Sequence, residues 1–121
     1  MSSPFPIPPP MIKSAWSIQS PSSGDRIYMW TTFIDVLAVK IYSVVRGSST
    51  PSVVWELRFS PDFSSTGTLI ASGTTTSTTA GNIVNVMSEA MIPAGSHVWL
   101  ELDTASGTVL EFGFTLHHRG A

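Results

Sequence analysis

The chain has 121 residues, of which 42% are hydrophobic and only 12% are charged, and its formal net charge is −2. This length predicts one domain with its own core, and six scattered basic residues supply no positive stripe for a nucleic acid. Cysteine is absent, which excludes disulfide frameworks, thiolate zinc sites and cysteine nucleophiles, while 19 serines and 13 threonines favour strands and turns over helices.

Residues 1–26 are predicted to form an N-terminal arm. Five prolines between Pro4 and Pro10 favour extended, polyproline-like backbone. The start has neither a basic region nor an apolar run, and no stretch is apolar enough for a bilayer span, so we expect a soluble chain without a secretory signal. The arm is too apolar for a solvated tail, and we expect it to lie on its own domain or on a neighbouring subunit. Its apolar residues are Phe5, Ile7, Met11, Ile12 and Trp16.

Residues 27–121 are predicted to form a β-sandwich domain, because apolar residues recur with period two and no stretch has a sustained helical period. The predicted strands are 27–33, 39–46, 52–59, 68–79 with a break or bulge at Gly73, and 83–87, with loops at 47–51 and 61–67. The alternation is clearest in SVVWELRF at 52–59. Its core-facing residues are Val53, Trp55, Leu57 and Phe59.

A hairpin is predicted near the C-terminus. IPAG (92–95) has the proline and glycine positions of a type I turn and leads into the strand HVWLEL (97–102). The strand VLEFGFTL (109–116) follows the three-residue loop Ala105–Gly107, in which the glycine suits a left-handed backbone. Loop length and hydrophobic parity agree, because core residues must face core residues. The implied pairs are Leu102 with Leu110, Leu100 with Phe112, and Val98 with Phe114.

On the outer face of this hairpin, the same register places Trp99 across from Gly113 and Glu101 across from Glu111. An indole over a cross-strand glycine covers bare backbone, whereas two opposed glutamates repel each other by about 0.2–1 kcal/mol. Two interpretations follow. Either another subunit, an arm or, as the minor alternative, a metal ion covers this face, or Trp99 covers Gly113 within the protomer and the glutamates point into water.

The residues that could carry chemistry form no recognisable site. His117 and His118 are adjacent in a strand, so they point to opposite faces and cannot bind one metal ion. His97 is expected to pair with Thr115 and to lie diagonally across from His117, which makes a metal site there the minor alternative to ordinary surface histidines. No nucleophile elbow, phosphate loop, dinucleotide fingerprint or EF-hand pattern occurs. We expect no enzyme activity, catalytic residue, metal, cofactor or small-molecule ligand.

Several motifs follow one another between about residues 35 and 118: a Val/Ile-rich strand ending in RG, SSTPSV, SGTTTSTT, IPAGSHVWLE and a final strand led by SGTV. Their order and spacing resemble a family of small virion proteins of tailed bacteriophages, of the head-decoration (cement) or fibre-tip-like type. The Pro-rich arm lies outside the resemblance. The resemblance implies a jelly-roll-like antiparallel β-sandwich that forms a homotrimer, is soluble in the host cytoplasm before assembly, and then decorates the capsid exterior.

The resemblance also implies partners, namely copies of the chain itself and the major capsid protein, but neither nucleic acid nor membrane. The apolar arm residues would then contact the capsid or a neighbouring trimer. The candidate trimer-interface residues are Trp99, Gly113, Glu101 and Glu111. The alternatives are a tail-fibre, spike or head-fibre domain that binds a host glycan, and a non-viral carbohydrate-binding or adhesion module, with Trp30 and Trp99 as candidate sugar contacts.

Overall fold

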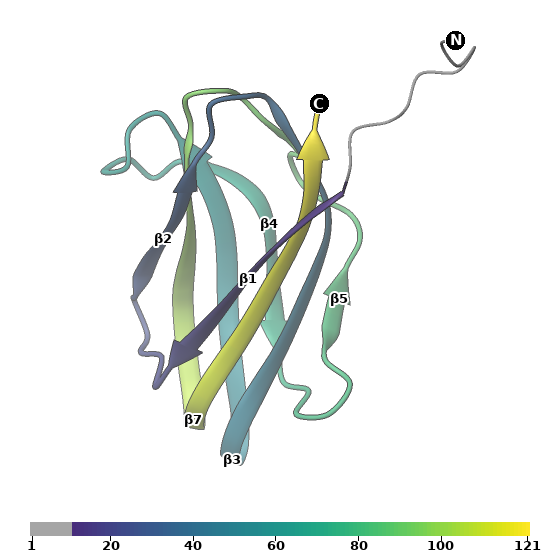
Figure 1. Ribbon diagram of the computed structural model, residues 1–121. Coiled ribbons are helices and arrows are strands. Elements are labelled where there is room, and N and C mark those ends of the chain that lie inside the picture. Colours follow the sequence, from purple (N-terminus) through teal and green to yellow (C-terminus); the bar gives the residue numbers. More distant parts are fainter. Residues whose placement is uncertain (1–10) are drawn as a thin grey trace, which may run out of the picture.

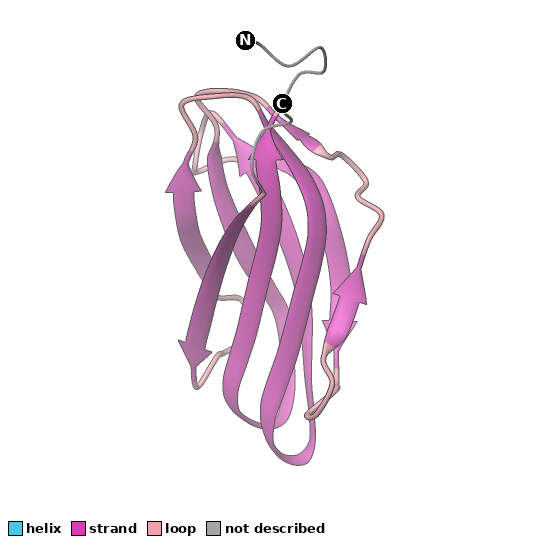
Figure 2. Ribbon diagram, turned by 45° about the vertical axis from the view of Figure 1, so that its right-hand side comes forward, coloured by secondary structure: helices cyan, strands magenta, loops and turns pink. Residues whose placement is uncertain are grey.

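Two long antiparallel strands form the centre of the fold (Figure 1). The computed structural model describes residues 11–121, in which strand β3 (Val36–Ser60) pairs with β7 (His97–Gly120) along its whole length, from Val36 opposite Gly120 to Ser60 opposite His97. The register shifts between Ser48 and Ser52, where both strands bend. The ribbon therefore folds over on itself, and each long strand contributes one half to each layer of a sandwich (Figure 2).

We call the two layers A and B. Layer A contains residues 36–48 of β3 and 108–120 of β7, and layer B contains residues 52–60 and 97–106. In layer A the flanking strands are β1 (Ile12–Gln19) beside β7, and β5 (Asn82–Val84) and β6 (Met91–Ile92) beside β3. In layer B they are β2 (Arg26–Thr31) beside β7 and β4 (Thr68–Thr75) beside β3.

All of these pairings are antiparallel, and the described part of the chain contains no helix. The predicted all-β antiparallel sandwich is therefore confirmed. Residues 11–121 accordingly offer no helix with the length and hydropathy needed to cross a membrane.

The core lies between the layers and forms because side chains alternate along each strand. Trp55 of layer B is fully buried and meets Phe114 of layer A edge to face, with ring centroids 5.1 Å apart. Its indole N–H donates to the Thr75 hydroxyl (3.0 Å), which in turn lies 2.6 Å from the Ser43 hydroxyl. The predicted core face of strand 52–59 is confirmed, since its four residues are all buried: Val53, Trp55, Leu57 and Phe59.

The predicted C-terminal hairpin is wrong. Leu100 pairs with Leu57, and Phe112 pairs with Val45, so both halves of β7 pair with β3 and not with each other. Leu110, expected in the core, is 44% exposed beside the bend. A hairpin and a two-stranded ribbon that folds over both change direction at turn-forming residues. In both arrangements, core residues also face core residues. Hydrophobic parity therefore cannot separate a hairpin from a ribbon that folds over.

The bend also replaces the loop predicted at 47–51. Ser49 and Thr50 have positive φ angles of 58° and 52°, and they lie against Gly107, whose φ is 69° as its predicted left-handed conformation requires. A Cβ at Gly107 would lie 2.5 Å from the Ser49 carbonyl oxygen. Close contact between the two bends is therefore part of the reason for glycine at this position.

Gly73 is not a break in β4, contrary to expectation. It lies in regular pairing opposite Trp55, and a Cβ there would come within 2.8 Å of the indole. The register shift in this strand pair lies instead between Leu57 and Arg58. Gly73 thus makes room for the largest core side chain.

Part of the predicted arm is a strand of the sandwich. β1 pairs with β7 from Ile12 opposite His118 to Gln19 opposite Glu111. Trp16 is half-buried and packs against the core, while Met11 and Ile12 are 50% and 48% exposed. The other two predicted arm contacts, Phe5 and Ile7, lie outside the described residues. A domain that begins at residue 27 would therefore omit one strand of layer A.

Candidate interaction surfaces

Trp99 points away from the core, as predicted, but it is fully buried within the protomer. The loop that follows β3 covers it. Phe63 packs edge-on against the indole at 5.4 Å, and a Cβ at Gly67 would come within 2.6 Å of the ring. From β2, the Arg26 guanidinium lies 4.7 Å from the ring centroid, while the indole N–H donates to Glu101 (2.9 Å). The indole has no surface left for a neighbouring subunit, which corrects the prediction of a trimer contact there.

The other members of the predicted interface are separated by the fold. Gly113 lies in layer A beside Val44 and Ser17, far along β7 from Trp99. Glu101 and Glu111 likewise lie in different layers. The prediction that these residues face one another is therefore wrong, and so is the interpretation that Trp99 covers Gly113.

Each glutamate has its own cationic partner, so no repulsion between them arises. Arg26 contacts Glu101 at 2.8 Å. Glu111 contacts Arg46 at 3.2 Å and accepts hydrogen bonds from Ser17 and from Gln19 (3.1 Å). The Ser17 hydrogen bond, followed by that of Arg46, lowers the pKa of Glu111 below its usual value. These exposed contacts hold β1 and β3 against β7 in layer A.

The histidines lie apart from one another. His117 and His118 face opposite sides of layer A, as predicted, but His97 pairs with Thr31 and Ser60 in layer B. The predicted approach of His97 to His117 is therefore wrong. Within residues 11–121, no group of three or more His, Cys, Asp or Glu side chains lies close enough together to hold a metal ion.

His118 is buried between the layers in a stack of aromatic rings. Its ring lies 5.1 Å from that of Trp30 in β2, which stacks in turn on Trp16 of β1 at 6.1 Å. Its Nε2 is 3.0 Å from the Ser14 hydroxyl, and its Nδ1 is buried without a hydrogen-bond partner among the described residues. Burial, and secondarily the charge of His117, lower the pKa of His118 below its ordinary value. The stack closes the side of the sandwich between β1 and β2.

We expect the stability of the protein to fall below about pH 6.5, where free histidine takes up a proton. The lowered pKa means that the unfolded chain binds this proton more readily than the fold does. The stability that depends on neutral His118 is therefore complete above pH 6.5 and is lost as the pH drops toward the lower pKa of the folded state. Unfolding free energies at pH 7.5 and 5.5 should differ less in His118→Asn than in wild type. The assignment would be contradicted if the difference between the two unfolding free energies were as large in His118→Asn as in wild type but smaller in the control His97→Asn.

Sequence analysis missed an exposed apolar end of the sandwich. Phe33 is 90% exposed and Ile34 is 59% exposed in the loop between β2 and β3. The loop is firmly held, because the Thr32 N–H donates to the Ser96 carbonyl (2.9 Å) and the Ala121 N–H donates to the Asp35 carbonyl (3.0 Å). Two adjacent apolar residues before an aspartate break the alternation of the preceding strand, and this irregularity was the available signal.

The described N-terminus lies at the same end. Met11 and Ile12, each about half exposed, begin β1 beside the end of β7 (Figure 1). The opposite end, where the ribbon folds over, carries small and hydroxyl-bearing residues at 47–50 and 104–108. Apart from Leu110 beside the bend, the fold-over end is polar, and the other end carries Phe33, the most exposed apolar side chain of the two ends.

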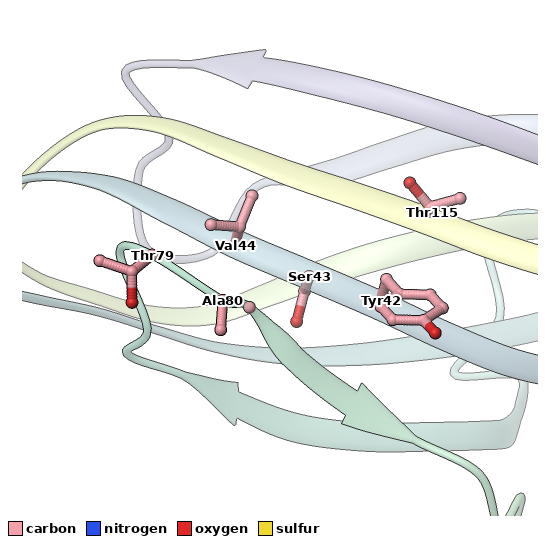
Figure 3. Close-up of a pocket in the computed structure, with 7 residues that line it drawn as sticks. Tyr42, Ser43, Val44, Thr79, Ala80 and Thr115 are labelled. Atoms are coloured by element: carbon pink, nitrogen blue, oxygen red, sulfur yellow. The ribbon is translucent and has the colours of Figure 1, made fainter.

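A second surface is a groove on the outer face of layer A. A hollow of about 230 Å³ lies between β3, β7 and the loop before β5, lined by residues that include Tyr42, Val44, Thr79 and Thr115 (Figure 3). A neighbouring hollow of about 310 Å³ shares Val44 and extends over Gly113. The two hollows meet at Val44 of β3, and we call them together the groove.

No protein-family model and no curated protein matches the chain. Among solved structures, it is similar to a chain described in "Bacillus endospore appendages form a novel family of disulfide-linked pili", with a TM-score of 0.44 and 15% identity, covering 100% of this chain and 98% of that one. It is also similar to a chain of infectious bursal disease virus strain Gt, with a TM-score of 0.35 and 10% identity over 93% of this chain and 33% of that one. Both similarities are too distant to assign a function.

Proposed function

We propose that the chain is a capsid decoration protein of a tailed bacteriophage, which binds the major capsid protein as a homotrimer and stabilises the head. The order of motifs between residues 35 and 118 supports the phage family, and the all-β sandwich agrees with the fold that this family implies. The proposed role is structural, and it uses surfaces in place of a catalytic centre.

The observation that carries the proposal is the apolar end of the sandwich. Phe33 and Ile34 are exposed on a loop whose backbone is hydrogen-bonded on both sides, so they are presented to a partner at little cost in ordering entropy. Covering each of these side chains contributes about 1.5–3 kcal/mol. Three such ends in one trimer act together through their high effective concentration on the particle. A protein that binds the capsid surface through one end needs exposed apolar side chains at that end.

The experiment is co-sedimentation of the purified chain with particles that lack it. We expect the double variant Phe33→Ser and Ile34→Ser to bind at least about 100-fold more weakly than wild type, because about 3 kcal/mol or more is lost from each subunit. Val86→Ser is the matched control, since Val86 is 84% exposed on another loop. Binding that survives in the double variant but not in the control would contradict the proposal.

The glycan-binding alternative loses its candidate residues in this structure. Trp55 and Trp99 are fully buried, while Trp16 and Trp30 are half-buried and stack on each other. Of the two candidate sugar contacts, Trp99 is fully covered and Trp30 is exposed only in part. The burial of the tryptophans therefore gives no support to the carbohydrate-binding alternative.

A further inference from the structure

We propose that the groove on the outer face of layer A binds the proline-rich segment, residues 1–10, of a neighbouring copy of the chain. This inference rests on the self-association in the proposed function, but not on binding to a capsid. It assigns the partner of a surface to which the resemblance gives no role.

The groove is already formed in the isolated protomer. On its β7 side the groove is lined by two small residues, Thr115 (Figure 3) in one hollow and Gly113 in the other. Its wall is the loop 76–81, which is tied to β3 by a hydrogen bond from the Val45 N–H to the Ser77 carbonyl (3.1 Å). The side chain of Asn82 holds this loop further by accepting hydrogen bonds from the backbone at 76 and 77, both at 3.2 Å. A partner would therefore meet a hollow that needs little rearrangement.

Apolar side chains lie in the groove and beside it, and they remain partly open to solvent. Tyr42 is 37% exposed, Val44 is 39% exposed, and Ile83, directly opposite Tyr42 in the register of β5, is 51% exposed. The ring of Tyr42, which lines the groove, lies 5.5 Å from the ring of His117. Such a strip on the outer face of a sheet gains free energy when an apolar partner covers it.

The polar groups of the groove suit a proline-rich partner. The hydroxyls of Tyr42, Thr79 and Thr115 make no hydrogen bond to any other residue within 11–121, so each has a free donor. Proline offers a carbonyl acceptor but no N–H donor. Aromatic-lined grooves with such donors recognise polyproline-type segments, which lose little entropy on binding.

The composition of residues 1–10 matches this surface. The segment MSSPFPIPPP has five prolines, the apolar residues Phe5 and Ile7, and no charged side chain. As an extended polyproline helix it would span about 31 Å, which is long enough to reach from one copy of the chain to a neighbouring copy. Its charge-free, apolar and acceptor-rich character complements a groove with a hydrophobic strip and free hydroxyl donors.

The segment is better placed for a neighbour's groove than for its own. β1 pairs with β7 up to Ile12 opposite His118, and β7 ends at Gly120, so its own sheet offers almost no further backbone for pairing upstream. Reaching its own groove would require the chain to reverse direction just before Met11. The consecutive prolines Pro8–Pro10 favour continued extension over such a reversal.

Disulfide trapping between two single-cysteine variants tests the proposal, because the natural chain has no cysteine. Full-length Ile7→Cys is mixed with full-length Thr79→Cys and oxidised without any particle present. We expect the mixed dimer to form at least about fivefold more than with the control Ser106→Cys, which is exposed at the fold-over end. Adding Val44→Asp to the Thr79→Cys chain should reduce the yield to the control level.

Two outcomes would overturn the inference. One is equal trapping with the groove cysteine and with Ser106→Cys. The other is trapping only within one chain, detected when a chain carrying both Ile7→Cys and Thr79→Cys loses its free thiols on oxidation but runs as a covalent monomer, while the two single-cysteine chains give no mixed dimer. Because no capsid is present, trapping that succeeds while particle binding fails would refute decoration alone. Particle binding with no trapping would refute the arm site alone.

Discussion

Trp55→Ala is expected to lower the free energy of unfolding by about 3–5 kcal/mol. The indole is fully buried, meets Phe114 of the opposite layer edge to face, and donates to the buried Thr75 hydroxyl. Truncation would leave a cavity at the contact between the two layers and remove one partner of a buried polar group, and neighbouring backbone cannot easily close around it.

Denaturant unfolding followed by far-ultraviolet circular dichroism measures this loss. Trp55→Phe should cost less, because it keeps part of the aromatic contact and loses only the N–H group and some volume. Val54→Ala is the matched control, since Val54 is the next residue along and points away from the core. If Trp55→Ala cost less than Val54→Ala, the two-layer packing described here would be wrong.

Gly47→Ala is expected to cost about 3 kcal/mol or more, or to prevent folding. A Cβ at this position would lie only 1.8 Å from the carbonyl oxygen of Thr108, which belongs to the backbone of the paired strand. Neither strand can move away without breaking the ladder at the point where the ribbon bends. The substitution therefore acts on the feature that turns one long pair of strands into two layers.

Gly113→Ala is the control for this substitution. It lies in the same strand pair, and the nearest atom to its Cβ would be a methyl group of Val44 at 3.2 Å, which a small side-chain shift can relieve. Thermal and denaturant unfolding should place Gly113→Ala within about 1 kcal/mol of wild type. Equal stabilities of the two variants would show that the close approach at the bend is not a constraint.

Period-two alternation predicted most of the strands and core faces because it reflects burial, which is local to each strand; β1 and the exposed Leu110 are the exceptions. Trp55 and Phe114 were both assigned to the core on this basis. Strand partners were harder to predict, since the bends at 47–51 and 103–107 satisfy the same turn preferences and the same parity as a hairpin. Choosing between them requires knowing that β3 and β7 bend at matching places, which is a property of two distant segments.

The residues of the candidate surfaces were likewise hard to predict where their surroundings come from distant segments. Alternation placed Trp99 outside the core correctly, but its cover comes from Phe63 and Gly67, more than thirty residues earlier, and no local pattern links them. In the arm, the alternation of Trp16 and Ile18 was the signal for β1, and the adjacent proline-rich composition obscured it. Phe33 was read as the end of a strand, although the fold leaves it in solvent.

The central claim is that the chain stabilises a capsid by binding to its exterior, and heating particles tests it most directly. Particles without the protein are heated alone, with the wild-type chain, and with the Phe33→Ser and Ile34→Ser variant, and DNA release is followed with an intercalating dye. We predict that wild type binds in hundreds of copies per particle and raises the temperature of release, while the variant does neither. Release at the same temperature with and without bound wild-type protein would contradict the account.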